Sequence, residues 1–441
     1  MTTPSDAQLA TIAGEIFILR DRSTTRLPKP VNTGPQAFTD AMNLVATDAR
    51  WTAASIGVID FTAFPTHPPN VWLHNADEPY RIGSAAKIAM MLAAMQLRLE
   101  VRRILKLSPQ IVSTAAEFDA LFSNRSLWKK GKLSAQEIKE IGDSPPLISK
   151  IFDFTKSPVD FTGPDPNART PADQTAILNK LSGGHLTWKT KPPLAFSERL
   201  WLAGAVSDNV AATACVSAIG VPYLKSVQRS YGLAEHPNGG MHLFSSGLHD
   251  NIPGSTDPPA PPPPRQLVYV DPIKVDDKWL TGANRDKSWV PGSAAALTAY
   301  MLALVGESFI VDPAVLVAGQ EGCTTIRNNL SDGGALALPS FLVDGPDRDT
   351  VSDGVSSITT ITTQFNKIGI LRHKDGAENP LLCEFVYLET KEVPPPAAPH
   401  RSVMKYAVIV VGLVSSMTSG PNTAEKSAAL GIAIHNALLK L

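Results

Sequence analysis

The sequence has few cysteines and almost no net charge. Its 441 residues include only three cysteines, and lysine and arginine together number 40 against 41 aspartate and glutamate residues. Cys215, Cys323 and Cys383 are far apart and form neither a CxxC pair nor a disulfide framework, so a reducing compartment is permitted. Binding to a phosphate backbone calls for clustered basic charge. The balanced charge therefore argues against a nucleic-acid partner.

Long apolar runs and a secretory signal are also missing. The most apolar stretches, Ile88–Met95 and Tyr406–Met417, are shorter than the roughly 20 residues that a membrane-spanning helix needs. The first residues show no basic segment followed by an apolar one. We therefore expect a soluble protein, cytoplasmic as the sequence stands, or periplasmic or secreted if a signal peptide was removed.

What the sequence does contain is enough apolar material for a large core. Hydrophobic residues make up 43% of the chain and charged residues 18%, which is typical of a globular protein. At roughly 150 residues per domain, the length suggests two or three domains or one two-lobed enzyme.

Strand-like patterns lie near both ends of the chain, and helical patterns fill the middle. We predict strands at Ser55–Phe61, Val71–His74, Ser357–Thr363, Phe365–Leu371, Leu381–Leu388 and Tyr406–Val414. We predict helices at Ala37–Ala46, Ile82–Arg103, Ser134–Glu140, Glu198–Ile219, Ala294–Val305 and Asn422–Leu441, the last capped by Asn422. The helix over Glu198–Ile219 is expected to end at Gly220, with Pro222 just beyond it, a combination typical of a helix end.

These patterns predict an α+β fold with two lobes. Residues 1–80 and 291–441 would build a discontinuous lobe around an antiparallel sheet flanked by helices. Residues 81–290 would form an inserted helical lobe, with extra segments near 105–195 and 236–291. The second extra segment contains the proline-rich run 258–264, which we interpret as a stiff surface loop and, as the alternative, a partner-binding segment.

Ser84 and Lys87 are the first candidates for chemistry. They lie three residues apart at the start of a predicted buried helix, where they share one face. Burial would lower the pKa of Lys87 and make a neutral amine available as a base. The same spacing occurs at Ser126 and at Ser402, but only Ser84 follows a strand and opens a buried helix. The alternative is that Ser84 merely caps the helix while Lys87 extends to the surface.

Two further elements lie downstream. Ser207, Asp208 and Asn209 are consecutive polar residues inside an apolar stretch, where they must satisfy their hydrogen bonds or form a surface turn. Lys367 lies on a predicted strand two residues before Gly369, and a glycine in a strand permits close approach of a ligand. The Ser-Asp-Asn sequence occurs once in the chain, whereas a lone Lys-x-Gly on a strand is nearly uninformative.

Taken in order, the three elements resemble the S-x-x-K, S-D-N and K-T-G motifs of the penicillin-recognising serine enzymes, the class A β-lactamases and DD-peptidases. The resemblance implies a serine hydrolase that forms an acyl-enzyme on Ser84. It also implies that Lys87 is the general base or a proton shuttle and that Ser207 relays protons to the leaving group.

The same resemblance implies a set of substrate-binding groups. Asn209 would hold the substrate amide, and Lys367 would supply positive charge for a substrate carboxylate. The N–H groups of Ser84 and of Ile370, next to Gly369, would form an oxyanion hole, with roughly 3 kcal/mol of stabilisation from each donor. The substrate would be a small molecule or a peptide-like amide or ester, and no cofactor is expected.

The sequence departs from the family pattern in two places. Ile368 stands where the family has Thr or Ser, so a hydroxyl for the substrate carboxylate is missing. No Glu-x-x-x-Asn segment follows the S-D-N element, because Glu235 is the only Glu between Ser207 and Glu307 and has the wrong spacing to Asn238. Both departures favour a peptidase, amidase or esterase over efficient β-lactam hydrolysis. A carboxylesterase or amidase without lactam activity and a non-catalytic binding protein are the alternative functions.

Metal binding is a weaker interpretation. His236, His242 and His249 share one stretch but lack the i, i+4 helical spacing of a zinc site, so we predict no metal. Cys215 lies on an apolar helix and is interpreted as a small core residue.

Overall fold

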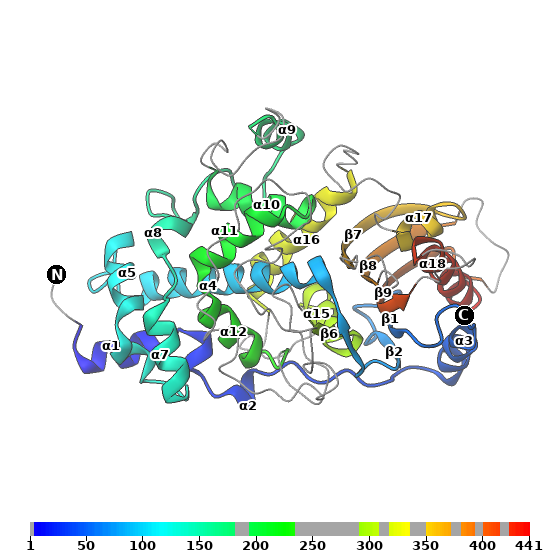
Figure 1. The fold of residues 1–441 in the computed structure, drawn as a ribbon, viewed down its shortest axis with the longest axis horizontal. Helices are drawn as coiled ribbons and strands as arrows, with labels where there is room; N and C mark the ends of the chain where they lie inside the picture. Colours follow the sequence, from blue (N-terminus) through cyan, green and yellow to red (C-terminus); the bar gives the residue numbers. More distant parts are fainter. Residues whose placement is uncertain are drawn as a thin grey trace.

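A five-stranded antiparallel sheet lies in the right-hand half of the molecule as drawn in Figure 1, with helices on both of its faces. The computed structural model describes residues 4–180, 194–233, 291–307, 317–335, 350–371, 381–392, 400–414 and 423–441. The strand order β2-β1-β9-β8-β7 joins the early strands to the late ones, so both ends of the chain build this sheet. The combination of this antiparallel sheet with many helices confirms the expected α+β class. The strands are β1 (Ser55–Asp60), β2 (Asn70–His74), β7 (Thr360–Leu371), β8 (Leu381–Lys391) and β9 (Val403–Val414).

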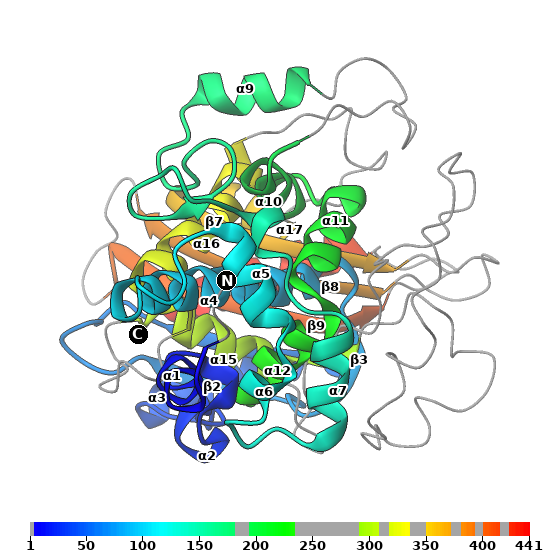
Figure 2. The same ribbon diagram turned by 90° about the vertical axis from the view of Figure 1, so that its left-hand side faces the viewer.

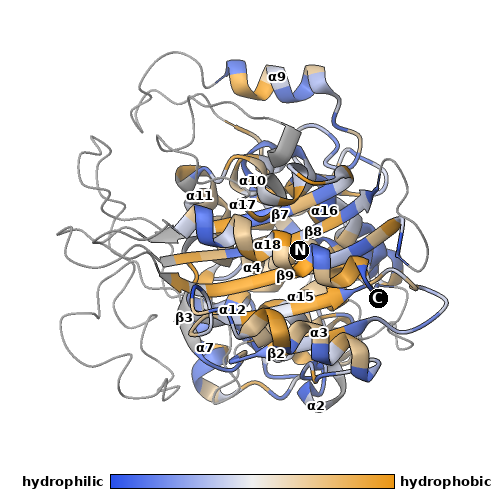
Figure 3. Ribbon diagram, turned by 90° about the vertical axis from the view of Figure 1, so that its right-hand side faces the viewer, coloured by the Kyte–Doolittle hydropathy of each residue, from blue (hydrophilic) through white to orange (hydrophobic). Residues whose placement is uncertain are grey.

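Strand β9 is buried on both faces, because helices cover the sheet on each side. Successive side chains of a strand point to opposite faces. Val408 and Val410 belong to an outer core with three helices, whereas Ala407 and Ile409 belong to the main core on the other face. This explains the continuous apolar run of β9, which is mostly hydrophobic in Figure 3. The helices of the outer core are α3 (Gln36–Ala46), α17 (Thr350–Ser356) and α18 (Thr423–Leu439).

Helix α4 (Lys87–Leu107) runs through the middle of the helical region (Figures 1 and 2). Every residue from Ile88 to Met95 has 0% exposure, as its apolar sequence predicts. The 3-10 turn η2 (Gly83–Ala86) leads directly into α4.

The other helices surround α4 or lie nearby. Those from the N-terminal half are α1 (Asp6–Ala13), η1 (Phe17–Leu19), α2 (Arg22–Thr25), α5 (Ala115–Ser123), α6 (Arg125–Trp128), α7 (Ala135–Asp143), α8 (Ile148–Ile151) and α9 (Pro171–Asn179). Those that follow are α10 (Phe196–Ala205), α11 (Asn209–Ile219), α12 (Val221–Ser230), α15 (Ala294–Val305) and α16 (Gly319–Ala335). Two short ribbons complete the described elements, β3 (Pro79–Arg81) with β6 (Pro291–Ser293) and β4 (Phe152–Asp153) with β5 (Asp160–Phe161).

The predicted single helix over Glu198–Ile219 is wrong, because the chain breaks between α10 and α11. Ser207, in the break, has a φ of +59°, which no α-helix accommodates. The expected helix end at Gly220 is confirmed, although a new helix follows it directly. Gly220, with a φ of +83°, ends α11, and α12 begins at once with Pro222 in its first turn, where a missing N–H costs no hydrogen bond.

Three other expectations from the sequence have different outcomes. The two strands predicted at Ser357–Thr363 and Phe365–Leu371 form one strand, β7, which begins at Thr360. The segment 236–290, with its three histidines and its proline-rich run, lies outside the described residues, as does Asn422. The division into lobes at residues 80 and 291 remains a prediction.

Within the described ranges, no single helix is long and apolar enough to cross a membrane. Helices α11 and α12 pass such a test only when taken together, and they meet at an angle of 81°. Cys215 and Leu224 from these two helices are part of the main core.

Candidate active site

Ser84 lies in η2, the turn between β3 and α4. Gly83 has a φ of +51°, a left-handed conformation that favours glycine and lets the chain turn sharply from strand to helix. The N–H of Lys87 donates to the carbonyl oxygen of Ser84. Ser84 and Lys87 are therefore about one helical turn apart, on one face, with Ser84 half-buried and Lys87 fully buried.

The Lys87 side chain reaches Ser207, which is 120 residues away in sequence. Its Nζ donates to the carbonyl oxygen of Ser207 at 2.5 Å and contacts the Ser207 Oγ at 3.1 Å. Burial holds the pKa of Lys87 well below its usual range, the nearby charge of Lys367 lowers it further, and Asp208 acts in the opposite direction. The expectation that burial lowers the pKa of this lysine is therefore met, and the alternative in which Lys87 extends to the surface is wrong.

Ser207 is presented by the break between α10 and α11. The N–H of Asp208 donates to the Leu202 carbonyl at 3.0 Å and closes the end of α10. The Asp208 side chain then accepts from the N–H of Ala211 at 2.6 Å and caps α11. Capping from both sides holds Ser207 in its left-handed conformation, with carbonyl and hydroxyl both directed at Lys87.

Strand β7 brings a second lysine to the site. Lys367 is only 4% exposed, and burial lowers its pKa to about 7. Lys367 and Phe365 lie on the face of β7 that joins the main core, whereas Ile368 packs against the outer core on the opposite face. The apolar character of Ile368 thus suits the apolar surroundings of its side chain.

Gly369 allows β7 to touch the turn that carries Ser84. A Cβ at Gly369 would lie 1.9 Å from the carbonyl oxygen of Ile82 and 3.0 Å from the N of Ala85, so no side chain fits there. The sequence indicated that this glycine permits close approach of a ligand. The close approach in the structure is to the protein's own backbone, and it brings the chain segments of Ser84 and Ile370 into contact.

Five of the seven candidate residues therefore come from segments that meet in one region: Ser84, Lys87, Ser207, Lys367 and Gly369. The other two are described only by their backbone. Asn209 is the first residue of α11, and Ile370 pairs with Leu382 of β8, but their side chains lie outside the described residues.

Asp208 and Gly83 had no expected role of their own. An Asp just before a helical run is a common N-cap, so the pattern itself offered a signal for Asp208. Gly83 carried no comparable signal, because its backbone conformation depends on how β3 meets α4.

Among the described residues, no three His, Cys, Asp or Glu side chains are arranged to hold a metal ion. All three cysteines are buried, and burial raises the pKa of each thiol well above its usual range. Cys215 therefore fits the expected small core residue rather than a nucleophile.

The sequence matches no known protein family and no curated protein. Among solved structures, a class A β-lactamase from Bacteroides cellulosilyticus is 10% identical, with a TM-score of 0.42 over 92% of this chain and 98% of that one. A β-lactamase from Streptosporangium roseum is 11% identical, with a TM-score of 0.38 over 92% and 100% of the two chains. One from Burkholderia phymatum is 11% identical, with a TM-score of 0.36 over 91% and 98%. These low identities and TM-scores assign no function to this chain.

Proposed function

We propose that this protein is a serine hydrolase that cleaves an amide or ester through an acyl-enzyme on Ser84. The observation that carries the proposal is the contact of the buried Lys87 amine with Ser207, one helical turn from Ser84. A neutral amine has two N–H donors and one lone pair. Lys87 can therefore hold Ser207 and still accept a proton, which is what a base for Ser84 requires.

The proposed reaction has an acylation step and a deacylation step. The neutral Lys87 amine takes the Ser84 Oγ proton as Oγ attacks the substrate carbonyl carbon. The N–H groups of Ser84 and Ile370 stabilise the oxyanion. The Ser207 hydroxyl gives its proton to the leaving nitrogen or oxygen as the scissile bond breaks, and Lys87 returns a proton to Ser207. Water then attacks the acyl-enzyme, releases the carboxylic acid and regenerates Ser84.

Lys367 and Asn209 would orient the substrate. With a pKa of about 7, Lys367 gains or loses its proton near neutral pH. It can therefore supply positive charge to a substrate carboxylate or a proton to Ser207. Asn209 would hold the substrate amide from the start of α11. The substrate class is a small molecule or a peptide-like amide or ester.

Ile368 favours a second version of this function, an esterase or amidase without β-lactam turnover. A Thr or Ser there would offer a hydroxyl, whereas the Ile368 side chain packs against the outer core. Comparing turnover of a p-nitrophenyl ester with turnover of a chromogenic cephalosporin separates the two versions.

Covalent labelling tests the proposal. We expect a fluorophosphonate or a fluorescent penicillin to add one adduct, which peptide mass spectrometry locates on Ser84. Ser84→Ala should abolish labelling, and Lys87→Ala should abolish it while leaving the fold intact. Ser126→Ala is the matched control, because Ser126 also lies three residues before a lysine and should keep full labelling. No label on Ser84 with either reagent would instead support a non-catalytic binding protein.

A further inference from the structure

We infer that Arg169 and Gly204 are positioning residues that set the contact between Lys87 and Ser207, an inference that rests on the proposed function of Ser84. Lys87 begins α4, and Ser207 follows the end of α10. The way these two helices cross therefore determines how the amine meets the carbonyl and hydroxyl of Ser207.

The two helices approach closely at Gly204, three residues before Ser207. A Cβ at Gly204 would lie 3.0 Å from the Cε of Met91 and 3.5 Å from the Cβ of Asn329. Met91 lies one turn beyond Lys87 on α4, and Asn329 lies on α16. The three helices α4, α10 and α16 thus meet within about one turn of both site residues, so a small shift of α10 here displaces Ser207.

Arg169 holds the same face of α10 from outside. Its Nη1 donates to Asn329 Oδ1 at 2.7 Å, and its Nη2 donates to the carbonyl oxygen of Ser197. Its guanidinium also lies 5.9 Å from the ring centroid of Trp201. Ser197, Trp201 and Gly204 have the i, i+4, i+7 spacing of one helix face. One guanidinium therefore joins α10 to α16 beside the crossing at Gly204.

The partner face of α16 is polar and equally regular. Thr325, Asn329 and Asp332 also follow i, i+4, i+7, and Asp332 Oδ2 accepts from Trp201 Nε1 at 2.8 Å. Asn329 is fully buried, so losing its hydrogen bond from Arg169 would leave a buried polar group without that partner, which is costly.

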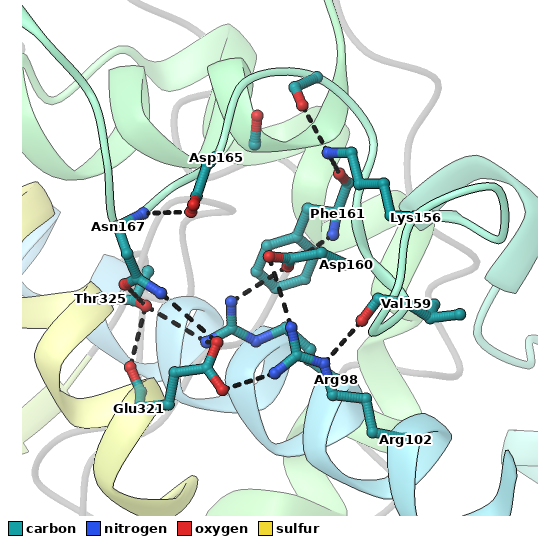
Figure 4. A network of polar contacts seen from close by, with 12 residues as sticks. Arg98, Arg102, Lys156, Val159, Asp160, Phe161, Asp165, Asn167, Glu321 and Thr325 are labelled. Carbon is teal, nitrogen blue, oxygen red and sulfur yellow. Dashed lines mark hydrogen bonds and ion pairs between the residues drawn. The ribbon is translucent and has the colours of Figure 1, made fainter. Parts of the chain in front are cut away.

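The segment that carries Arg169 is itself anchored. Asn167 accepts a hydrogen bond from Thr325 of α16, and Asp160 pairs with Arg98 of α4 at 3.1 Å (Figure 4). Arg102 of α4 pairs with Glu321 of α16 in the same network. Contacts with α4 and α16 therefore hold the segment that carries Arg169, which makes Arg169 a fixed clamp between α10 and α16.

Removing the clamp should loosen α10 against α16 and let water reach Lys87. Because burial is the largest influence on the pKa of Lys87, hydration should raise that pKa. The rate of Ser84 labelling depends on the neutral amine, so its acid limb should move to higher pH. At pH 7 we expect the maximal labelling rate to fall on the order of tenfold or more, with little change in probe affinity.

The test compares Arg169→Met with Arg22→Met. Arg22 is also a half-buried arginine in a buried polar contact, with Glu137, but it lies on α2, away from α10 and β7 (Figures 1 and 2). We would measure fluorophosphonate labelling of Ser84 between about pH 5 and pH 9. Lysine NMR with ¹³C at Cε gives the pKa of Lys87 without any reaction, and thermal unfolding reports stability.

The inference is supported if Arg169→Met slows labelling and raises the Lys87 pKa, if Arg169→Lys is intermediate, and if Arg22→Met changes only stability. It is overturned if Arg169→Met keeps the wild-type labelling profile and the wild-type Lys87 pKa. Should wild-type Ser84 resist labelling, the proposed function fails, and the NMR measurement still decides whether Arg169 acts on Lys87. If Arg169→Met does not fold, Gly204→Ala replaces it. Its methyl group would crowd the flexible end of Met91 at 3.0 Å and make an ordinary contact with the Cβ of Asn329 at 3.5 Å, so it should give a smaller change of the same sign.

Discussion

Glu100 is a fully buried carboxyl group in the helical region, and replacing it with glutamine should change how stability depends on pH. Its Oε1 accepts from the N–H of Phe17 at 2.9 Å and from Gln96 Nε2 at 3.1 Å, and its Oε2 accepts from the Tyr223 hydroxyl at 2.8 Å. Burial raises the pKa of Glu100 to about 7 although these three hydrogen bonds lower it. The native state therefore binds a proton that the unfolded chain releases.

The size of the effect follows from this pKa. One pKa unit corresponds to about 1.4 kcal/mol. The rise from 4.5 to about 7 makes the proton stabilise the native state by about 3 kcal/mol below the unfolded pKa. This contribution is lost as the pH rises through 7. Glutamine has the same shape and does not titrate, so the stability of Glu100→Gln relative to wild type should increase by about 3 kcal/mol between pH 4.5 and pH 8.

Urea unfolding of both proteins across this pH range measures the difference, because all other titrating groups cancel. Glu137→Gln is a control of opposite sign. Burial pushes the pKa of Glu137 upward, but hydrogen bonds from Arg22 and Ser134 and the charge of Arg22 hold it at about 2. That variant should lose stability relative to wild type as the pH rises above the acid range. A Glu100→Gln difference that does not vary with pH would contradict this prediction, because it would show that folding does not raise the pKa of Glu100.

Three further predictions concern the site and the outer core. Gly369→Val should separate β7 from the Ser84 turn and reduce Ser84 labelling by about a hundredfold, because even a Cβ there would lie 1.9 Å from the carbonyl oxygen of Ile82. Gly131→Ala is the control. A Cβ at Gly131 would also crowd backbone, that of Leu19 in the helical region, so this variant should lower stability and keep labelling. Asp208→Ala should lower the free energy of unfolding by about 1 kcal/mol, because the N-cap of α11 is lost. It should also shift the acid limb of the labelling rate to lower pH, because Asp208 raises the pKa of Lys87. A shift to higher pH would contradict this role of Asp208. Burial lowers the pKa of His435 although Glu392 opposes it, so stability should fall as the pH drops below about 6.5, and His435→Gln should flatten that decline in urea unfolding.

Local sequence was sufficient where the physical cause is local. The apolar residues from Ile88 to Met95 indicate a helix buried on all sides, and the continuous apolar run of β9 indicates a strand covered on both faces. The spacing of Ser84 and Lys87 places both on one face by helical geometry alone. The motif order then suggested where a serine nucleophile, its base and a second serine would lie.

Tertiary structure decided what depends on contacts between distant segments. Composition favoured one helix through Ser207, but closure of α10 by Asp208 and capping of α11 break it there. Gly369 is required by the backbone of Ile82, almost 290 residues earlier in the chain, and Arg169 has a role only because α10 and α16 cross beside it. Helix and strand propensities act over a few residues. The position of the Lys87 amine is instead set by packing between helices that are distant in sequence, and the local sequence of one helix does not specify how it packs against the other.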